Sequence, residues 1–141
     1  MRFLLPLLCL ALASCEPAPI TTVETAPPSI TLPASIPELT PTQAAEWMSQ
    51  NPSATLLDLR MPEEVTREGK LPGSQNYDYL QSTTLEKLGQ LDHQKPYLLY
   101  CALGGRAKRA ALQMNQLGFP QIVVLKGGLN AWMTEGHPVI K

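Results

Sequence analysis

The sequence carries little charge and no long apolar segment. Charged residues make up 16% of its 141 residues and the formal net charge is -1, so no basic surplus is present to drive nucleic-acid binding. No apolar run reaches the roughly 18 residues of a membrane-spanning helix, and no heptad or Gly-X-Y repeat indicates a coiled coil or a collagen. The 44% of hydrophobic residues is nevertheless too high for a chain that is disordered throughout.

Motifs for metals and phosphates are also missing. The chain has two histidines, His93 and His137, and neither lies in a cluster of metal-ligand type. There is no phosphate loop, zinc motif or pair of catalytic carboxylates. We therefore expect no metal and no cofactor, in a chain whose length allows one folded domain.

Proline is the residue in excess. The chain has 14 prolines, about twice the usual share of roughly 5%, and they concentrate before residue 42. Residues 16–37 are rich in proline and threonine and show no helical or strand period, which predicts an extended spacer. At about 3.1 Å per residue the fully extended spacer could reach about 70 Å. The alternative is a short extension packed on the domain through Ile30, Leu32 and Ile36.

The first fifteen residues predict an export signal. Met1 and Arg2 precede an apolar run, and small residues lead to Cys15, the layout of a secretory signal peptide. Residues 12–15, Leu-Ala-Ser-Cys, resemble the bacterial lipobox, in which the chain is cut before a cysteine that then receives lipid. The alternative is an ordinary signal peptide with an incidental cysteine.

The lipobox resemblance implies a division of the chain into three parts. Residues 1–14 would be the cleaved lipoprotein signal peptide, and residues 15–37 the lipidated Cys15, with acyl chains such as palmitate, and its tether. Residues 38–141 would be a folded domain held at a membrane of the bacterial envelope and facing the periplasm. The residue after Cys15 is Glu16. An aspartate at this position would favour the inner membrane, so the glutamate favours the outer membrane.

The folded part alternates short apolar strands with helical segments, which predicts an α/β domain with a mainly parallel, five-stranded sheet flanked by helices. The clearest predicted strands lie at residues 54–59, 96–100 and 121–125. Two capping boxes predict helix starts, one at Thr40 with Gln43 and one at Thr83 with Glu86.

Cys101 ends a predicted strand and is followed by a short glycine-containing loop and a helix from Arg106. Since parallel sheets carry their sites at the carboxyl ends of the strands, this is the place for chemistry. Gly104 and Gly105 allow the loop to curl, so its N–H groups and the helix N-terminus can stabilise a thiolate. Arg106, with the nearby Lys108 and Arg109, should add positive charge.

The cysteine count supports a reactive thiol. Processing would remove Cys9 and block Cys15 with lipid, which leaves Cys101 as the only thiol of the mature chain. The alternative is a buried, inert cysteine at the end of a strand.

Six short motifs follow one another along the folded part: 56–60 (LLDLR), 62–65 (PEEV), 71–76 (LPGSQN), 101–106 (CALGGR), 127–132 (GGLNAW) and 137–139 (HPV). In order and spacing they resemble the rhodanese family of sulfurtransferases. The resemblance covers residues 40–141. It implies that Cys101 forms a persulfide and passes sulfur from a donor such as thiosulfate to a thiophilic acceptor, and that Ala102, Leu103, Gly104, Gly105 and Arg106 bind the substrate and the persulfide.

The partners implied by the resemblance are a small sulfur-containing anion or thiol, and a protein that donates or accepts sulfur. The loop from Cys101 to Arg106 is one residue shorter than in the related dual-specificity phosphatases, which favours sulfur chemistry over a phosphatase or an arsenate reductase. The second hypothesis is a non-catalytic sulfur carrier. Asp58 and Arg60 are candidates for support beneath the loop, with a purely structural ion pair as the alternative.

The chain also departs from the family pattern. Ala107 stands where a hydroxyl residue is frequent, and Lys70 replaces a histidine. Ala102 and Leu103 are apolar at loop positions that are often polar or basic. These two positions leave the identity of the sulfur donor open.

Overall fold

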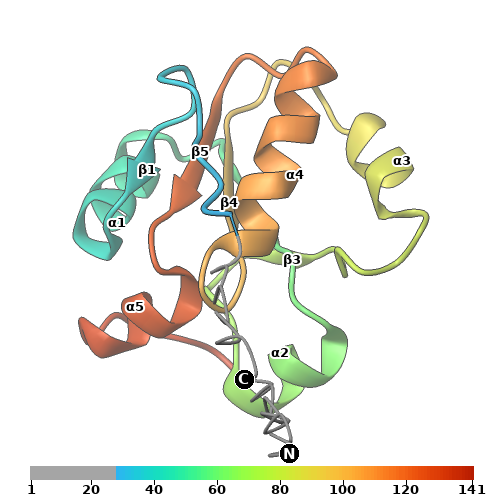
Figure 1. The fold of residues 1–141 in the computed structure, drawn as a ribbon. Coiled ribbons are helices and arrows are strands. Elements are labelled where there is room, and N and C mark those ends of the chain that lie inside the picture. Colours follow the sequence, from blue (N-terminus) through green and yellow to red (C-terminus); the bar gives the residue numbers. More distant parts are fainter. Residues whose placement is uncertain (1–27) are drawn as a thin grey trace, which may run out of the picture.

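Short apolar segments form a five-stranded parallel sheet (Figure 1). The structure, a computed structural model, describes residues 28–141. The strands are β1 (Glu38–Leu39), β2 (Thr55–Asp58), β3 (Gln75–Asn76), β4 (Tyr97–Tyr100) and β5 (Ile122–Leu125). They lie in the order β1-β5-β4-β2-β3, and every neighbouring pair is parallel. The predicted fold class is confirmed, although the two-residue β1 was not foreseen.

Helices cover both faces of the sheet. They are α1 (Pro41–Gln50), α2 (Pro62–Glu68), α3 (Thr84–Gly89), α4 (Gly105–Gln116) and α5 (Gly128–Thr134). Figure 1 shows α3 and α4 on one side of the sheet and α1 and α5 on the other. Because successive strand residues point to opposite faces, Leu99 packs in the cluster with α4 and Leu98 in the cluster with Trp132 of α5. Because both faces of the sheet are buried, the sequences of the central strands are continuous apolar runs.

The chain leaves the two central strands in opposite directions. From β2 it passes to β3, and from β4 it passes to β5 on the other side of the sheet. The carboxyl ends of β2 and β4 therefore flank a topological switch point, where open α/β sheets bind ligands. In Figure 1 the loop before α4 and helix α2 both lie at this edge.

The last part of the predicted spacer packs against the domain. Ile36 is buried among residues of the α4 face, and Leu32 packs against the same cluster. The N–H of Val124 donates to the carbonyl of Pro37 at 3.0 Å, which begins the β1–β5 pairing. The part of the chain that packs on the domain therefore begins before residue 38. This agrees with the alternative to a spacer, a short extension packed through apolar residues. The signal peptide and Cys15 lie outside the described residues.

The two predicted capping boxes have different outcomes. At α1, Thr40 Oγ1 accepts from the N–H of Gln43 at 3.3 Å, and Gln43 Oε1 accepts from the N–H of Thr40 at 3.0 Å, so this box is confirmed. At α3 the predicted helix start is confirmed, because the helix begins at Thr84, but the predicted capping hydrogen bond of Thr83 is not formed. Thr83 has helical backbone angles and makes no side-chain cap, whereas the hydroxyl of Thr84 donates to the carbonyl of Asp78 and ties the helix to the preceding loop.

Candidate active site at the carboxyl edge of the sheet

Cys101 directly follows β4 and lies almost completely buried on the α4 face, with 2% of its surface exposed. The N–H of Gly104 donates to Cys101 Sγ at 3.1 Å. Gly104 has a φ of 110°, a left-handed conformation that favours glycine. The glycine therefore turns the loop so that a backbone donor faces the sulfur, as an anion-stabilising loop requires.

Helix α5 holds the outer side of the same loop. The N–H of Leu129 donates to the carbonyl of Cys101 at 2.8 Å, and the N–H of Asn130 donates to that of Ala102 at 3.1 Å. A Cβ at Gly128 would overlap the Cys101 carbonyl and lie 2.6 Å from the Ala102 oxygen. Only glycine fits this approach, a role that the sequence reasoning missed although the Gly127–Gly128 pair signalled it.

Arg106 is clamped by a carboxylate from another segment. Its Nη1 and Nη2 donate to Glu64 Oε2 and Oε1 at 2.7 and 2.8 Å, and both side chains are mostly buried. The pKa of Arg106 is raised by these hydrogen bonds, although burial opposes the shift, and the neighbouring Cys101 sulfur raises it further. The same ion pair lowers the pKa of Glu64 to about 2. Glu64 was not among the predicted site residues.

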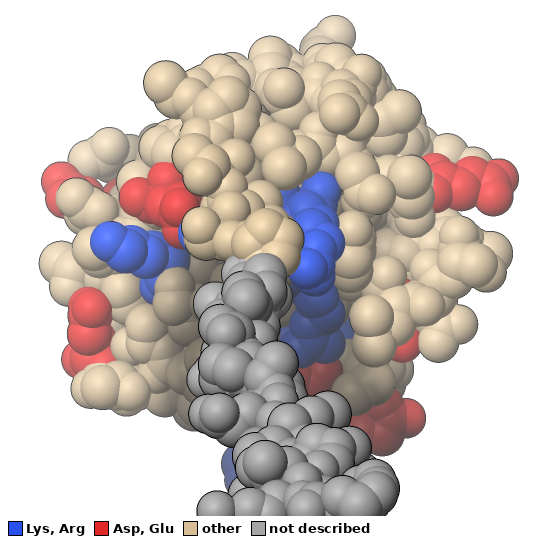
Figure 2. Space-filling view, in the orientation of Figure 1, with Lys and Arg blue, Asp and Glu red and all other residues tan. Residues whose placement is uncertain are grey.

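The positive charge predicted around the sulfur is largely neutralised. Arg106 pairs with Glu64, and Lys108 Nζ lies 2.9 Å from Glu38 Oε2. Within residues 28–141 no carboxylate lies at ion-pair distance from Arg109. Figure 2 shows basic side chains gathered along the middle of the face that carries α4. Stabilisation of a sulfur anion therefore falls mainly to the Gly104 N–H and the N-terminus of α4.

Asp58 and Arg60 form a buried ion pair, with Arg60 Nη2 at 2.6 Å from Asp58 Oδ2. Both side chains are fully buried, and the Tyr100 hydroxyl donates to the same Asp58 oxygen at 2.8 Å. Tyr100 packs on the α1 and α5 face of the sheet, opposite to Cys101. Since Arg60 also donates to the Gly69 carbonyl at 2.6 Å and lies 3.2 Å from Glu68 Oε2, the pair fastens the C-terminal end of α2. The pair touches the segment of the thiol through Tyr100, which directly precedes Cys101.

The remaining predicted loop residues have unequal exposure. Ala102 is half-buried, Gly105 is exposed and begins α4, and Leu103 has 71% of its surface exposed. An exposed leucine beside the buried thiol is the one large apolar side chain that the loop offers to solvent.

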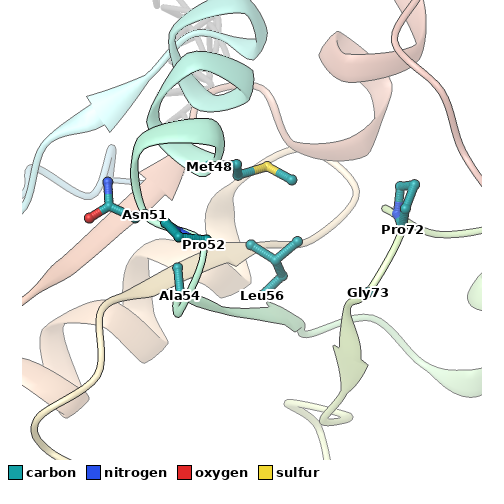
Figure 3. A pocket seen from close by; sticks show the side chains of 7 residues that line it. All are labelled: Met48, Asn51, Pro52, Ala54, Leu56, Pro72 and Gly73. Atoms are coloured by element: carbon teal, nitrogen blue, oxygen red, sulfur yellow. The ribbon is translucent and has the colours of Figure 1, made fainter.

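A separate hollow lies at the opposite edge of the sheet. Figure 3 shows Met48 of α1, Leu56 of β2 and Pro72 around it. Its lining residues include no nucleophile and no charged side chain. Within residues 28–141 no group of three His, Cys, Asp or Glu side chains could hold a metal ion. None of the helices in this range has the length and apolar character to cross a membrane.

Comparison with known proteins identifies the family of this chain. The family described as the rhodanese-like domain matches residues 40–135, which include the Cys101 loop, Glu64 and the α5 glycines. The chain belongs to the rhodanese-like family. Its relatives include proteins named sulfurtransferases, and the family assignment inferred from the six motifs is confirmed.

Three similar proteins illustrate how identity and coverage vary among the relatives. The chain is 30% identical over 102 residues to the thiosulfate sulfurtransferase GlpE of Glaesserella parasuis, covering 72% of this chain and 91% of that protein. A crystal structure of a rhodanese-related protein from Thermoplasma volcanium has a TM-score of 0.65 and 32% identity, covering 74% of this chain and 97% of that one. The match to the adenylyltransferase/sulfurtransferase MoeZ of Mycobacterium tuberculosis, at 28% identity, covers 71% of this chain but only 25% of that protein's length.

Proposed function

We propose that this rhodanese-like protein is a sulfurtransferase that carries sulfane sulfur as a persulfide on Cys101. The observation that supports this most directly is the Gly104 N–H aimed at Cys101 Sγ at 3.1 Å. A donor fixed in this position lowers the energy of a thiolate without having to reorganise during the reaction. The names of the relatives support sulfur as the transferred group.

The proposed reaction has two displacement steps. In the first, the Cys101 thiolate attacks the outer sulfur of a donor such as thiosulfate. The donor's S–S bond breaks and sulfite leaves with the electron pair. In the second, a thiophilic acceptor, such as cyanide or a thiolate, attacks the outer persulfide sulfur, and the Cys101 thiolate leaves. The Gly104 N–H faces Sγ, which carries the charge in the thiolate form and bears the outer sulfur in the persulfide form.

Loop geometry favours sulfur over phosphorus. The loop runs six residues from Cys101 to Arg106, and Arg106 is already bound by both Glu64 oxygens. A phosphatase needs loop N–H groups and an arginine available to a phosphoryl group, whereas a persulfide needs room for one further sulfur atom. Hydrolysis of an aryl phosphate or reduction of arsenate by the purified protein would contradict this preference.

Intact-mass analysis tests the proposal. Incubation with thiosulfate should add one sulfur atom to the protein, and subsequent cyanide should remove it and release thiocyanate. The Cys101→Ala variant should gain no sulfur. Repeated turnover would support an enzyme, and a single loading without turnover would support the carrier hypothesis. If no donor adds sulfur to Cys101, the proposed function is wrong.

We further propose that lipid on Cys15 holds this domain at the periplasmic side of a membrane, with the outer membrane as the expected site. The support is the lipobox-like sequence of residues 12–15 and the Glu16 that follows it. A single acyl chain gives only marginal binding, so several chains are required for stable anchoring. A Cys15→Ala chain should leave the membrane fraction and lose its lipid mass. Membrane retention of this variant would refute the anchor.

A further inference from the structure

A cavity of about 300 Å³ borders the second half of the Cys101 loop. It is lined by residues 28–30 from the N-terminal segment, by Leu103 and Gly105 of the loop, and by Lys108 and Arg109 of α4. Leu103 and Gly105 flank Gly104, whose N–H contacts the sulfur. The cavity therefore borders the loop that holds the sulfur, on both sides of its Gly104 donor in the sequence.

The lining of this cavity combines two kinds of chemistry. Ile30 and the exposed Leu103 supply apolar surface from two different segments, and Arg109 supplies a positive charge. Lys108 also lines the cavity, but its charge is shared with Glu38. Small organic ligands occupy pockets of roughly 300–1,000 Å³, so the cavity fits an organic anion better than thiosulfate or cyanide alone.

Through Ile30, the segment that precedes β1 contributes to the lining of this cavity. Ile36 and Leu32 anchor this segment on the α4 face, and the chain before them continues to the cavity. Residues 28–30 are therefore held beside the loop by packing that lies only a few residues away.

We propose that this cavity binds the organic part of an anionic thiol that accepts sulfur from Cys101, with Ile30 of the protein's own N-terminal segment as a specificity-determining wall. This inference rests on the function proposed above. Ile30 and Leu103 contact an apolar substituent of the thiol, and Arg109 pairs with its carboxylate.

In the proposed sulfur transfer to the thiol, atoms and electrons balance without a further reactant. The bound thiolate attacks the outer sulfur of the Cys101 persulfide and forms a new S–S bond. The original S–S bond breaks, and its electron pair stays on Cys101 as the thiolate. The acceptor leaves as an organic persulfide with the same total charge, so no external oxidant or reductant is needed.

The probe for this inference is 2-mercapto-3-phenylpropanoate, which carries a thiol, a carboxylate and an apolar ring. The full chain is loaded with thiosulfate, and kcat/KM is measured for the probe and for cyanide as acceptors. The ratio of the two values should fall about fivefold in Ile30→Ser and in Arg109→Gln, because each loses one contact to the probe. Lys95→Gln, a charge removal at the opposite edge of the sheet, is the matched control and should keep the wild-type ratio.

The outcomes separate this inference from the proposed function. If Cys101 loads with sulfur and transfers it to cyanide, but both variants keep the wild-type ratio, the cavity inference is overturned and the sulfurtransferase stands. If Cys101 never loads, the proposed function fails, and the cavity inference fails with it. If the variants and the control unfold at the same temperature, a changed ratio of kcat/KM values reflects contact with the acceptor and not a loss of folding.

Discussion

Arg106 and Glu64 join the loop after β4 to the helix after β2 through two hydrogen bonds of 2.7 and 2.8 Å. The two residues lie 42 positions apart in the sequence and meet across the topological switch point of the sheet. The ion pair thus connects the segment that carries Cys101 with α2, whose N-terminus is itself bound through Glu64 Oε2 and the N–H of Met61 at 2.9 Å.

Replacing Glu64 by glutamine should impair both stability and sulfur transfer. The variant leaves the mostly buried Arg106 charge without its carboxylate, which we expect to lower the free energy of unfolding by about 2 kcal/mol. A guanidinium that is no longer held should also reduce the rate of persulfide formation about tenfold. Urea denaturation and stopped-flow measurement of sulfur loading test the two effects.

Glu63→Gln is the matched control for this experiment, since Glu63 is an exposed neighbour on the same helix. It should change neither quantity measurably. Equal losses in the two variants would show that the charge of α2, and not the clamp on Arg106, is responsible.

The same ion pair makes stability depend on pH in an acidic window. Arg106 lowers the pKa of Glu64 from 4.5 to about 2 in the folded protein, so the unfolded chain binds the proton more readily. The stabilisation is fully present above the unfolded pKa and is lost as the pH falls from 4.5 towards 2. Thermal unfolding of Glu64→Gln should show a shallower slope in this window than the wild type. Identical slopes would assign the acid sensitivity to other carboxyl groups.

Gly128→Ala should disturb the active loop directly. The added Cβ would overlap the carbonyl of Cys101, so the loop or α5 must shift. We expect a loss of about 2–4 kcal/mol in unfolding free energy and a loading rate reduced at least tenfold. Gly136→Ala is the control, because Gly136 also has a positive φ, of 82°, but a Cβ there meets no atom within 4 Å. It should cost only about 1–2 kcal/mol and leave sulfur loading intact.

Tyr100→Phe should destabilise the domain without affecting sulfur chemistry. The Tyr100 hydroxyl donates to Asp58 and accepts from the N–H of Leu71 at 3.1 Å in a fully buried site. Burial and the Asp58 carboxylate raise the pKa of Tyr100, so the hydroxyl remains a donor at neutral pH. Its removal should cost about 1–3 kcal/mol.

The control for this prediction is Tyr79→Phe, which removes a half-buried hydroxyl bonded to Gln113 at 3.1 Å. Its cost should be smaller, about 0.5–1.5 kcal/mol. If the role of Tyr100 is purely structural, the rate of sulfur loading on Cys101 should stay unchanged. A loading rate that falls with Tyr100→Phe would mean that the network on the α1 and α5 face reaches Cys101.

Local features of the sequence predicted most of the framework. The apolar runs before Cys101 and around Val123 were readable as strands because burial on both faces leaves no polar alternation. The capping pair Thr40 and Gln43 formed as predicted, since both partners belong to one helical turn. Thr83 and Glu86 show the same pattern without the cap, because Thr83 has helical backbone angles and not the extended angles of a capping residue.

The N-terminal segment shows a second limit of local reasoning. Residues 16–37 have one composition throughout, and composition alone predicts a spacer. Ile36 is nevertheless in the core, since the sheet and α4 together leave an apolar site that a nearby isoleucine can fill. Whether an isolated apolar residue packs depends on surfaces formed by distant parts of the chain.

The sequence by itself determined the conformation of the loop that follows Cys101. Cys101, Gly104 and the helix that follows lie within a few residues of one another, and short-range backbone geometry is sufficient to aim an N–H at the sulfur. Only the tertiary structure decided which group holds Arg106. Glu63, Glu64 and Glu68 are equivalent candidates in the sequence of α2, and Glu64 binds Arg106 because the packing of α2 at the sheet edge directs that one carboxylate, and neither of the others, towards the loop after β4.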